Sequence, residues 1–269
     1  MASLVGGGDK YRDYLSDEEL KNTKWRNGPP SYDVVDKLFE QERTHVWAEG
    51  SVEDKVQRLL KTWEMELVHK IDPNDMKSVD PTKFKKSVNG EKERVTNLNV
   101  SVTLIKKESL LYTYFGVVIG RKGLTPEEAI KLGGGYNTFL QTSLPENLRV
   151  YNPDDETFES SQNVFRSIFI RGFAIEVLHV YSGPPEIVYK FRHWGYMDGP
   201  FKGYVATGQL VELFGIGIFE LEKESNKIVK AEFFFDRGEL LGPLMKGGKY
   251  GESTSEMELL EASKCPFMK

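Results

Sequence analysis

The stretch of sequence that decides the fold runs from residue 187 to residue 241: IVYKFRHWGYMDGPFKGYVATGQLVELFGIGIFELEKESNKIVKAEFFFDRGELL. Its apolar and aromatic runs are broken by glycine-rich and polar turns, a pattern that predicts three successive strands. A fourth strand is expected just before them, at residues 173–181, ahead of the turn Gly183-Pro184-Pro185. Together these segments predict four antiparallel strands in the second half of the chain.

The last of these strands ends in a charged residue, Asp236, directly after an aromatic run. Side chains alternate between the two faces of a strand, so Glu232, Phe234 and Asp236 share one face, and Phe233 and Phe235 share the other. Asp236 is either a turn residue, as Asp-Arg-Gly suggests, or an acid or base that faces a pocket. Glu232 lies about 13 Å from it along the strand, so the two carboxylates would have to act singly. Burial beside aromatic rings would raise the pKa of either one and make it a usable base near neutral pH.

The strand at residues 187–198 carries the other candidates for chemistry. Alternation divides its side chains into two sets, one of Phe191, His193 and Met197, the other of Arg192, Trp194, Tyr196 and Asp198. The sequence alone does not say which set lies inside. His193 is therefore either a hydrogen-bonded core residue or a catalytic group, and Asp198 is either a turn former or a pocket residue.

Helices are expected ahead of the sheet. One should begin after Ser31, and a second after Ser51, whose spacing to Asp54 resembles a capping box. The apolar stripe of the second helix ends at Trp63, and residues 64–71 are expected to form a strand. Thr125-Pro126-Glu127-Glu128 predicts another helix start, and residues 157–171 predict an amphipathic helix that Gly172 ends.

This order of elements predicts an α+β fold, with helices packed on one side of an antiparallel sheet. Residues 1–30 are expected to be an N-terminal leader. Residues 31–248 should form one domain with an inserted segment at about 106–150, and residues 249–269 a flexible tail. Further strands are expected at residues 98–105 and 110–119.

The composition argues against several classes of function. The 269 residues carry a net charge of -5, whereas nucleic-acid binding leaves a basic patch, and they contain four histidines without metal-ligand spacing and one cysteine, Cys265. No phosphate loop, dinucleotide fingerprint or serine-nucleophile motif is present. We therefore expect no metal, no organic cofactor, no nucleic-acid partner and no membrane association. The lone cysteine and the lack of a signal-peptide pattern predict a cytoplasmic location.

Several motifs resemble a known family. The run from Tyr189 to Gly247 resembles the SnoaL-like branch of the nuclear-transport-factor-2-like superfamily, through Gly195-x-x-x-Gly-Pro-Phe, Ala206-Thr-Gly and Asp236 followed by Glu-Leu-Leu-Gly. More narrowly, nearly the whole chain is similar to the plant pathogen-related protein family. The segments that carry this similarity are Tyr-Arg-Asp-Tyr-Leu at 11–15, Thr-Ser-Leu-Pro at 142–145, Phe-Glu-Ser-Ser at 158–161, Val-Tyr-Ser-Gly-Pro-Pro at 180–185, Lys-Phe-Arg-His-Trp-Gly at 190–195 and Cys-Pro-Phe at 265–267.

The resemblance implies a curved antiparallel sheet wrapped round helices into a cone, with a central apolar pocket for a small apolar or polycyclic metabolite. It also implies a homodimer that pairs through its sheets. In SnoaL-like cyclases the acidic residue at the position of Asp236 is the catalytic base, which removes a proton from carbon without metal or cofactor. Many relatives carry a pocket histidine where this chain has Met197. The acid–base role of that histidine is therefore absent here. His193 could take over the role only if the strand face that carries it points inward.

Two functions remain open at this point. One is a cofactor-free cyclase, isomerase or lyase of plant specialised metabolism, and the other is a ligand-binding defence protein with the same pocket and no turnover. One scaffold can host both functions. The residues expected to carry catalysis are Asp236, His193 and Glu232, and those expected to bind substrate are Arg192, Trp194, Tyr196, Phe234 and Met197.

Overall fold

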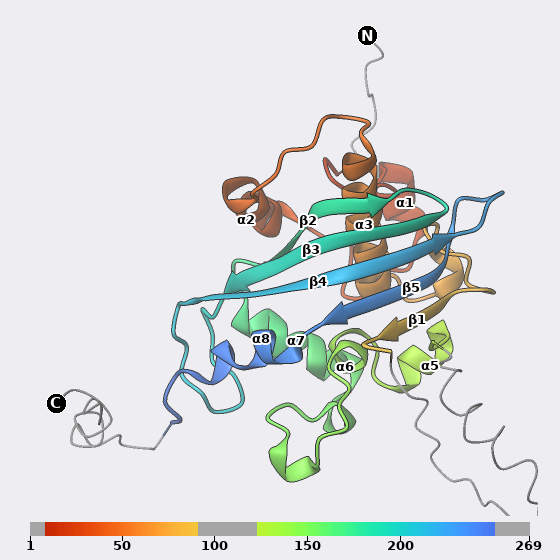
Figure 1. The fold of residues 1–269 in the computed structure, drawn as a ribbon. Helices are drawn as coiled ribbons and strands as arrows, with labels where there is room; N and C mark the ends of the chain where they lie inside the picture. The colour runs from red at the N-terminus through yellow and green to blue at the C-terminus, as the bar shows by residue number, and fades with distance from the viewer. Residues whose placement is uncertain (1–8, 91–122, 251–269) are drawn as a thin grey trace, which may run out of the picture.

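A curved sheet of five strands organises the computed structural model, which describes residues 9–90 and 123–250 (Figure 1). The strands lie in the order β1-β5-β4-β3-β2, with β2 to β5 antiparallel and β1 parallel to β5. This arrangement confirms the predicted α+β class and the four antiparallel strands. The strand bounds are β1 Lys85–Val88, β2 Phe173–Ser182, β3 Glu186–Tyr196, β4 Leu210–Leu221 and β5 Ile228–Phe235.

One face of the sheet is crossed by α3, which lies behind the strands in Figure 1. Helix α2 lies near the upper end of α3 in this view, and α6, α7 and α8 lie near its lower end. The helix bounds are α1 Asp17–Asn22, α2 Asp33–Glu42, α3 Val52–His69, α5 Pro126–Lys131, α6 Gly135–Phe139, α7 Phe158–Ile168 and α8 Arg237–Leu241. Single 3-10 turns lie at Pro73–Asp75, Glu146–Leu148, Pro153–Asp155 and Pro243–Met245.

The predicted helix starts are correct, but the end predicted for the second helix is wrong. Ser51 caps α3 by accepting from the backbone N–H of Asp54, and Thr125 forms a capping box with Glu128. The strand expected at residues 64–71 is absent, because α3 continues to His69. Met65 is buried and Leu67 packs against the hydrophobic core in these last turns, and this packing stabilises the helix.

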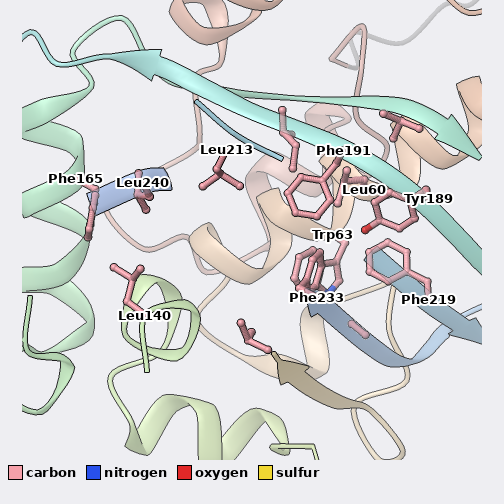
Figure 2. Packing of buried hydrophobic residues seen from close by; sticks show 14 of the residues in the cluster. Leu60, Trp63, Leu140, Phe165, Tyr189, Phe191, Leu213, Phe219, Phe233 and Leu240 are labelled. Carbon is pink, nitrogen blue, oxygen red and sulfur yellow. The ribbon is translucent and has the colours of Figure 1, made fainter. Parts of the chain in front are cut away.

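Aromatic side chains hold α3 against the sheet. Trp63 is 2% exposed, and its ring stacks on Phe233 with centroids 5.2 Å apart and lies 5.6 Å from Phe219. Figure 2 shows these rings, one from α3 and two from neighbouring strands, turned toward one another. Such pairs add roughly 0.5–1.5 kcal/mol each beyond the area that they bury.

Two glycines of β4 make room for the large rings of β3. Phe191 pairs with Gly215, and Tyr189 pairs with Gly217. A Cβ atom at either glycine would collide with the ring of its partner. The Gly-x-Gly pattern of this strand therefore allows bulky aromatic side chains to cover the inner face of the sheet.

Some sequence predictions lie outside the described residues. These are the strands expected at residues 98–105 and 110–119 and nearly all of the tail from residue 251 onward. Residues 9–30 pack over the domain, where Leu15 is 6% exposed and Arg12 is 3% exposed.

Candidate functional site

A cavity of about 370 Å³ lies between α3, α7 and the inner face of the sheet. Much of its wall is apolar, and Figure 2 shows several of its side chains turned toward the interior. These come from α7, from the loop after α6, from β4 and from α8: Phe165, Leu140, Leu213 and Leu240. A cavity of this size can enclose a small organic molecule.

Two titratable side chains meet at the wall of this cavity, Glu64 from α3 and His193 from β3. The Oε1 atom of Glu64 lies 3.7 Å from Nε2 of His193. The other imidazole nitrogen, Nδ1, lies 2.8 Å from the carbonyl oxygen of Ala174. A carbonyl oxygen only accepts, so Nδ1 carries a proton and Nε2 is left to exchange a proton with Glu64 or with a ligand.

The ring of His193 is held in place from a second side. It stacks on Phe173, with centroids 3.8 Å apart and an interplanar angle of 24°. Because both this stacking and the hydrogen bond to Ala174 fix the imidazole, its Nε2 atom points in one direction. Fixed geometry of this kind is what proton transfer requires.

Glu64 is ionised at neutral pH in the empty cavity. Burial raises the pKa of Glu64, but the facing His193 and the charges of Arg12 and Lys61 lower it more, so the pKa lies below its usual value. The 30% of the side chain that remains accessible faces the cavity. A bound apolar molecule would remove water from this surface and raise the pKa of Glu64 again.

The mouth of the cavity is formed by lining residues that are also exposed: Ser31, Val34, Arg166 and Ile170. These belong to the start of α2 and to the end of α7 and the residues that follow it. His69, at the end of α3, also lines the cavity. Its ring lies edge-on to Tyr32, with centroids 5.7 Å apart.

His69 gives the folded protein a specific pH dependence. Burial, together with the charge of Arg166, lowers the pKa of His69 from 6.5 to about 4. Between these two pH values the unfolded chain binds a proton that the folded protein does not, so stability is present above pH 6.5 and is lost as the pH falls toward 4. Between pH 6.5 and pH 4 the free energy of unfolding of His69→Gln should fall by about 1–2 kcal/mol less than that of the wild type, as measured by urea unfolding at both pH values. An equal fall in the free energy of unfolding of the variant and the wild type would show that His69 does not cause this pH dependence.

The outer face of the sheet, away from the cavity, holds three predicted binding residues. Trp194 Nε1 donates to Glu42 at 3.1 Å, and the Tyr196 hydroxyl donates to the other oxygen of Glu42 at 2.8 Å. Arg192 pairs with Glu212 at 2.8 Å and with the buried Glu176 at 3.4 Å. Because Glu42 ends α2, these residues fasten that helix to the outside of the sheet.

The remaining predicted residues also lie away from the cavity. Phe234 is 41% exposed, and Glu232 pairs with Lys230 at 2.6 Å, both on the outer face of β5. Met197 is fully buried in the core without lining the cavity. Asp236 is exposed and caps α8, where its Oδ1 accepts from the N–H of Gly238 at 2.7 Å. Of the eight predicted site residues, the structure brings only His193 to the cavity.

Sequence reasoning missed Glu64. The signal was present, since Glu64 follows Leu60 by four residues and so falls on the apolar stripe of the helix. A charged residue on such a stripe faces the interior and needs a partner. Because residues 64–71 were predicted to form a strand, Glu64 was not counted as part of the helical stripe.

Within residues 9–90 and 123–250 no group of three or more histidine, cysteine or carboxylate side chains is placed to hold a metal ion. In the same ranges no helix has the length and apolar character needed to cross a membrane. The cytoplasmic location predicted from the sequence stays a prediction.

The fold and cavity define a class of α+β proteins in which a curved sheet and helices enclose a small-molecule-sized space. Within that class, the chain belongs to the pathogen-related protein family: it is 47% identical over 272 residues to a pathogen-related protein of barley (Hordeum vulgare), covering all of this chain and 99% of the barley protein. No model of a known protein family matches the chain.

Solved structures with similar arrangements are more distant. One is described as a SnoaL-like polyketide cyclase from Jannaschia sp. CCS1, at 15% identity over 76% of this chain and 100% of that one, with a TM-score of 0.35. Another is described as a polyketide cyclase, from Acidithiobacillus ferrooxidans, at 11% identity over 75% of this chain and 100% of that one, with a TM-score of 0.35. At this level of similarity neither informs the activity of this chain.

Proposed function

We propose that this protein binds a small apolar molecule in the cavity and moves a proton to or from one of its carbon atoms, without a cofactor. The observation that carries this proposal is the contact between Glu64 and His193 in an apolar wall. The reaction would be an isomerisation, cyclisation or elimination in plant specialised metabolism.

The pair has the groups that such a reaction needs. The Glu64 carboxylate can take a proton from a carbon next to a carbonyl group, which leaves the electron pair on the carbonyl oxygen as an enolate. Protonated Nε2 of His193 can hydrogen-bond that oxygen or return a proton to another carbon. When His193 has returned a proton to the molecule, the proton that Glu64 removed passes to Nε2 of His193, and the pair ends the cycle as it began.

A binding protein without turnover is the second candidate. It is favoured by the name of the barley relative, which refers to pathogens and to no reaction. Both candidate functions need the cavity. They differ only in whether Glu64 and His193 transfer a proton to or from the bound molecule.

A proton-exchange experiment separates the two candidates. The bicyclic ketone 2-tetralone carries exchangeable protons beside its carbonyl group and is small enough for a cavity of about 370 Å³. We expect the protein to speed the uptake of deuterium from heavy water at that carbon, followed by NMR, well above the rate in buffer. Saturable binding without faster exchange would favour the binding protein instead.

We also propose that the protein is a homodimer joined through the outer face of the sheet. Phe214 on β4 is 47% exposed and Phe234 on β5 is 41% exposed, and the partly exposed Ile216 pairs with Phe234 between them. Such an apolar patch on the outside of a sheet is typical of an interface between proteins.

A charged substitution tests this interface. Phe214→Glu should shift the sedimentation mass from about twice the chain mass of 30.7 kDa to the mass of one chain. The control is Lys223→Glu, in the turn between β4 and β5, which should leave the mass unchanged. A wild-type mass near 30.7 kDa at micromolar concentration would contradict the proposal.

A further inference from the structure

Arg166 is an exposed cation at the mouth of the cavity, on the last full turn of α7. Its guanidinium takes part in no hydrogen bond or ion pair with any of the residues that the structure describes. Its charge nevertheless acts on two groups of the cavity wall, His69 and Tyr136. A guanidinium in this position is free to bind an anion that reaches the mouth.

The other cations of the cavity wall are already neutralised. Arg12 is 3% exposed and pairs with Asp36 at 2.9 Å and with Asp9 at 3.0 Å. Lys61 is 1% exposed, lies 3.7 Å from Asp36, and sits over the ring of Phe39 at 3.5 Å. Asp9 and Asp36 thus offset both of these buried charges before any ligand binds.

Glu159 of the same helix and Glu64 of the cavity wall are also engaged with other partners. Glu159, on the same helix, pairs with Arg26 at 3.1 Å. Glu64 faces His193 across the cavity wall. Arg166 therefore presents an exposed positive charge at the mouth, while much of the wall behind it is apolar.

We propose that the cavity takes apolar molecules that carry one acidic group, and that the Arg166 guanidinium binds this group at the mouth; this substrate class rests on the proposed binding function. The apolar body then lies against Phe165, Leu213 and Phe233, which all line the cavity. A carboxylate held at the mouth fixes which carbon of the molecule comes near Glu64. Arg166 is in this sense a specificity-determining residue, and Glu64 and His193 remain the proton-transfer pair.

A matched pair of probes tests this inference. 2-Naphthoic acid is an anion at neutral pH, and its methyl ester has the same rings without the charge. Affinities for the full chain can be measured by calorimetry at fixed ionic strength. We expect the acid to bind about ten- to a hundred-fold more tightly than the ester, the range of a charge-assisted hydrogen bond.

Arg166→Gln should remove this preference by weakening acid binding alone, and unchanged ester binding would show that the cavity is intact. Lys37→Gln is the matched control, since Lys37 is an exposed cation on α2 that does not line the cavity. It makes the same change in net charge and should keep the preference.

Two results would overturn the inference. Equal affinities of acid and ester for the wild type, or an unchanged preference in Arg166→Gln, would do so while leaving the proposed function in place. Failure of both probes to bind at millimolar concentration would remove the proposed binding function as well. The exchange of 2-tetralone, which is neutral, tests proton transfer independently of Arg166.

Discussion

Glu64→Gln should slow the deuterium exchange of 2-tetralone by about two to four orders of magnitude, the usual contribution of a general acid or base. Glutamine keeps the size of the side chain and can still face His193, but it cannot accept the proton. The affinity for 2-tetralone should change far less, because the lost interaction acts in the transition state. NMR measures the change in exchange rate, and calorimetry on the same preparations measures the change in affinity.

Asp236→Asn is the matched control for this experiment. It makes the same carboxylate-to-amide change at the residue that the SnoaL-like resemblance identifies as a base. Asn also suits a helix N-cap, so the cap of α8 should survive and exchange should continue at the wild-type rate. The reverse outcome, with exchange lost in Asp236→Asn and kept in Glu64→Gln, would assign the base to Asp236 and contradict our proposal.

The strands could be predicted from the sequence because their inner and outer side chains differ strongly. In β4 the inner residues Leu213 and Phe219 are buried, whereas Phe214 on the outer face is exposed. Alternation of this kind is visible in a single sequence. The same rule correctly grouped Glu232 and Phe234 on one face of β5, although it could not say that this face lies outside; Asp236 follows the end of the strand and caps α8.

The candidate site was harder to predict because its two halves come from distant parts of the chain. His193 was a candidate, since its strand was recognised, but its partner Glu64 lies 129 positions earlier on a helix. No local pattern links the two residues. Their contact depends on how α3 crosses the sheet, and this is set by packing of Trp63 against Phe219 and Phe233.

The outer face of β3 shows a second limit of sequence reasoning. Arg192, Trp194 and Tyr196 are residue types that often line binding sites, and their alternation was predicted correctly. Which face of a sheet points inward depends on what covers each side. Here Glu42 at the end of α2 takes up two of their hydrogen bonds, so the face is closed by a helix rather than by a ligand.

Glu66→Ala should reduce the free energy of unfolding by about 3–5 kcal/mol, the range for removing one partner of a buried ion pair. Glu66 and Lys70 are a fully buried pair at the end of α3, 2.9 Å apart. The Glu66 carboxylate also accepts from the backbone N–H groups of Lys77 at 2.8 Å and Ser78 at 2.9 Å. Alanine would leave a buried ammonium with less compensation, and the buried N–H of Ser78 and the partly buried N–H of Lys77 without this partner.

The reason for so large an effect is that Glu66 joins two parts of the chain at once. It ties the last turn of α3 to the segment before β1, and Lys70 continues the link to Glu19 at 3.1 Å. Lys55→Ala, at an exposed position of the same helix, is the control and should stay within about 0.5 kcal/mol of wild type. Urea unfolding of both variants measures the difference. A loss below about 1 kcal/mol in Glu66→Ala would mean that water can replace the carboxylate, and that this end of α3 is less firmly anchored than its burial indicates.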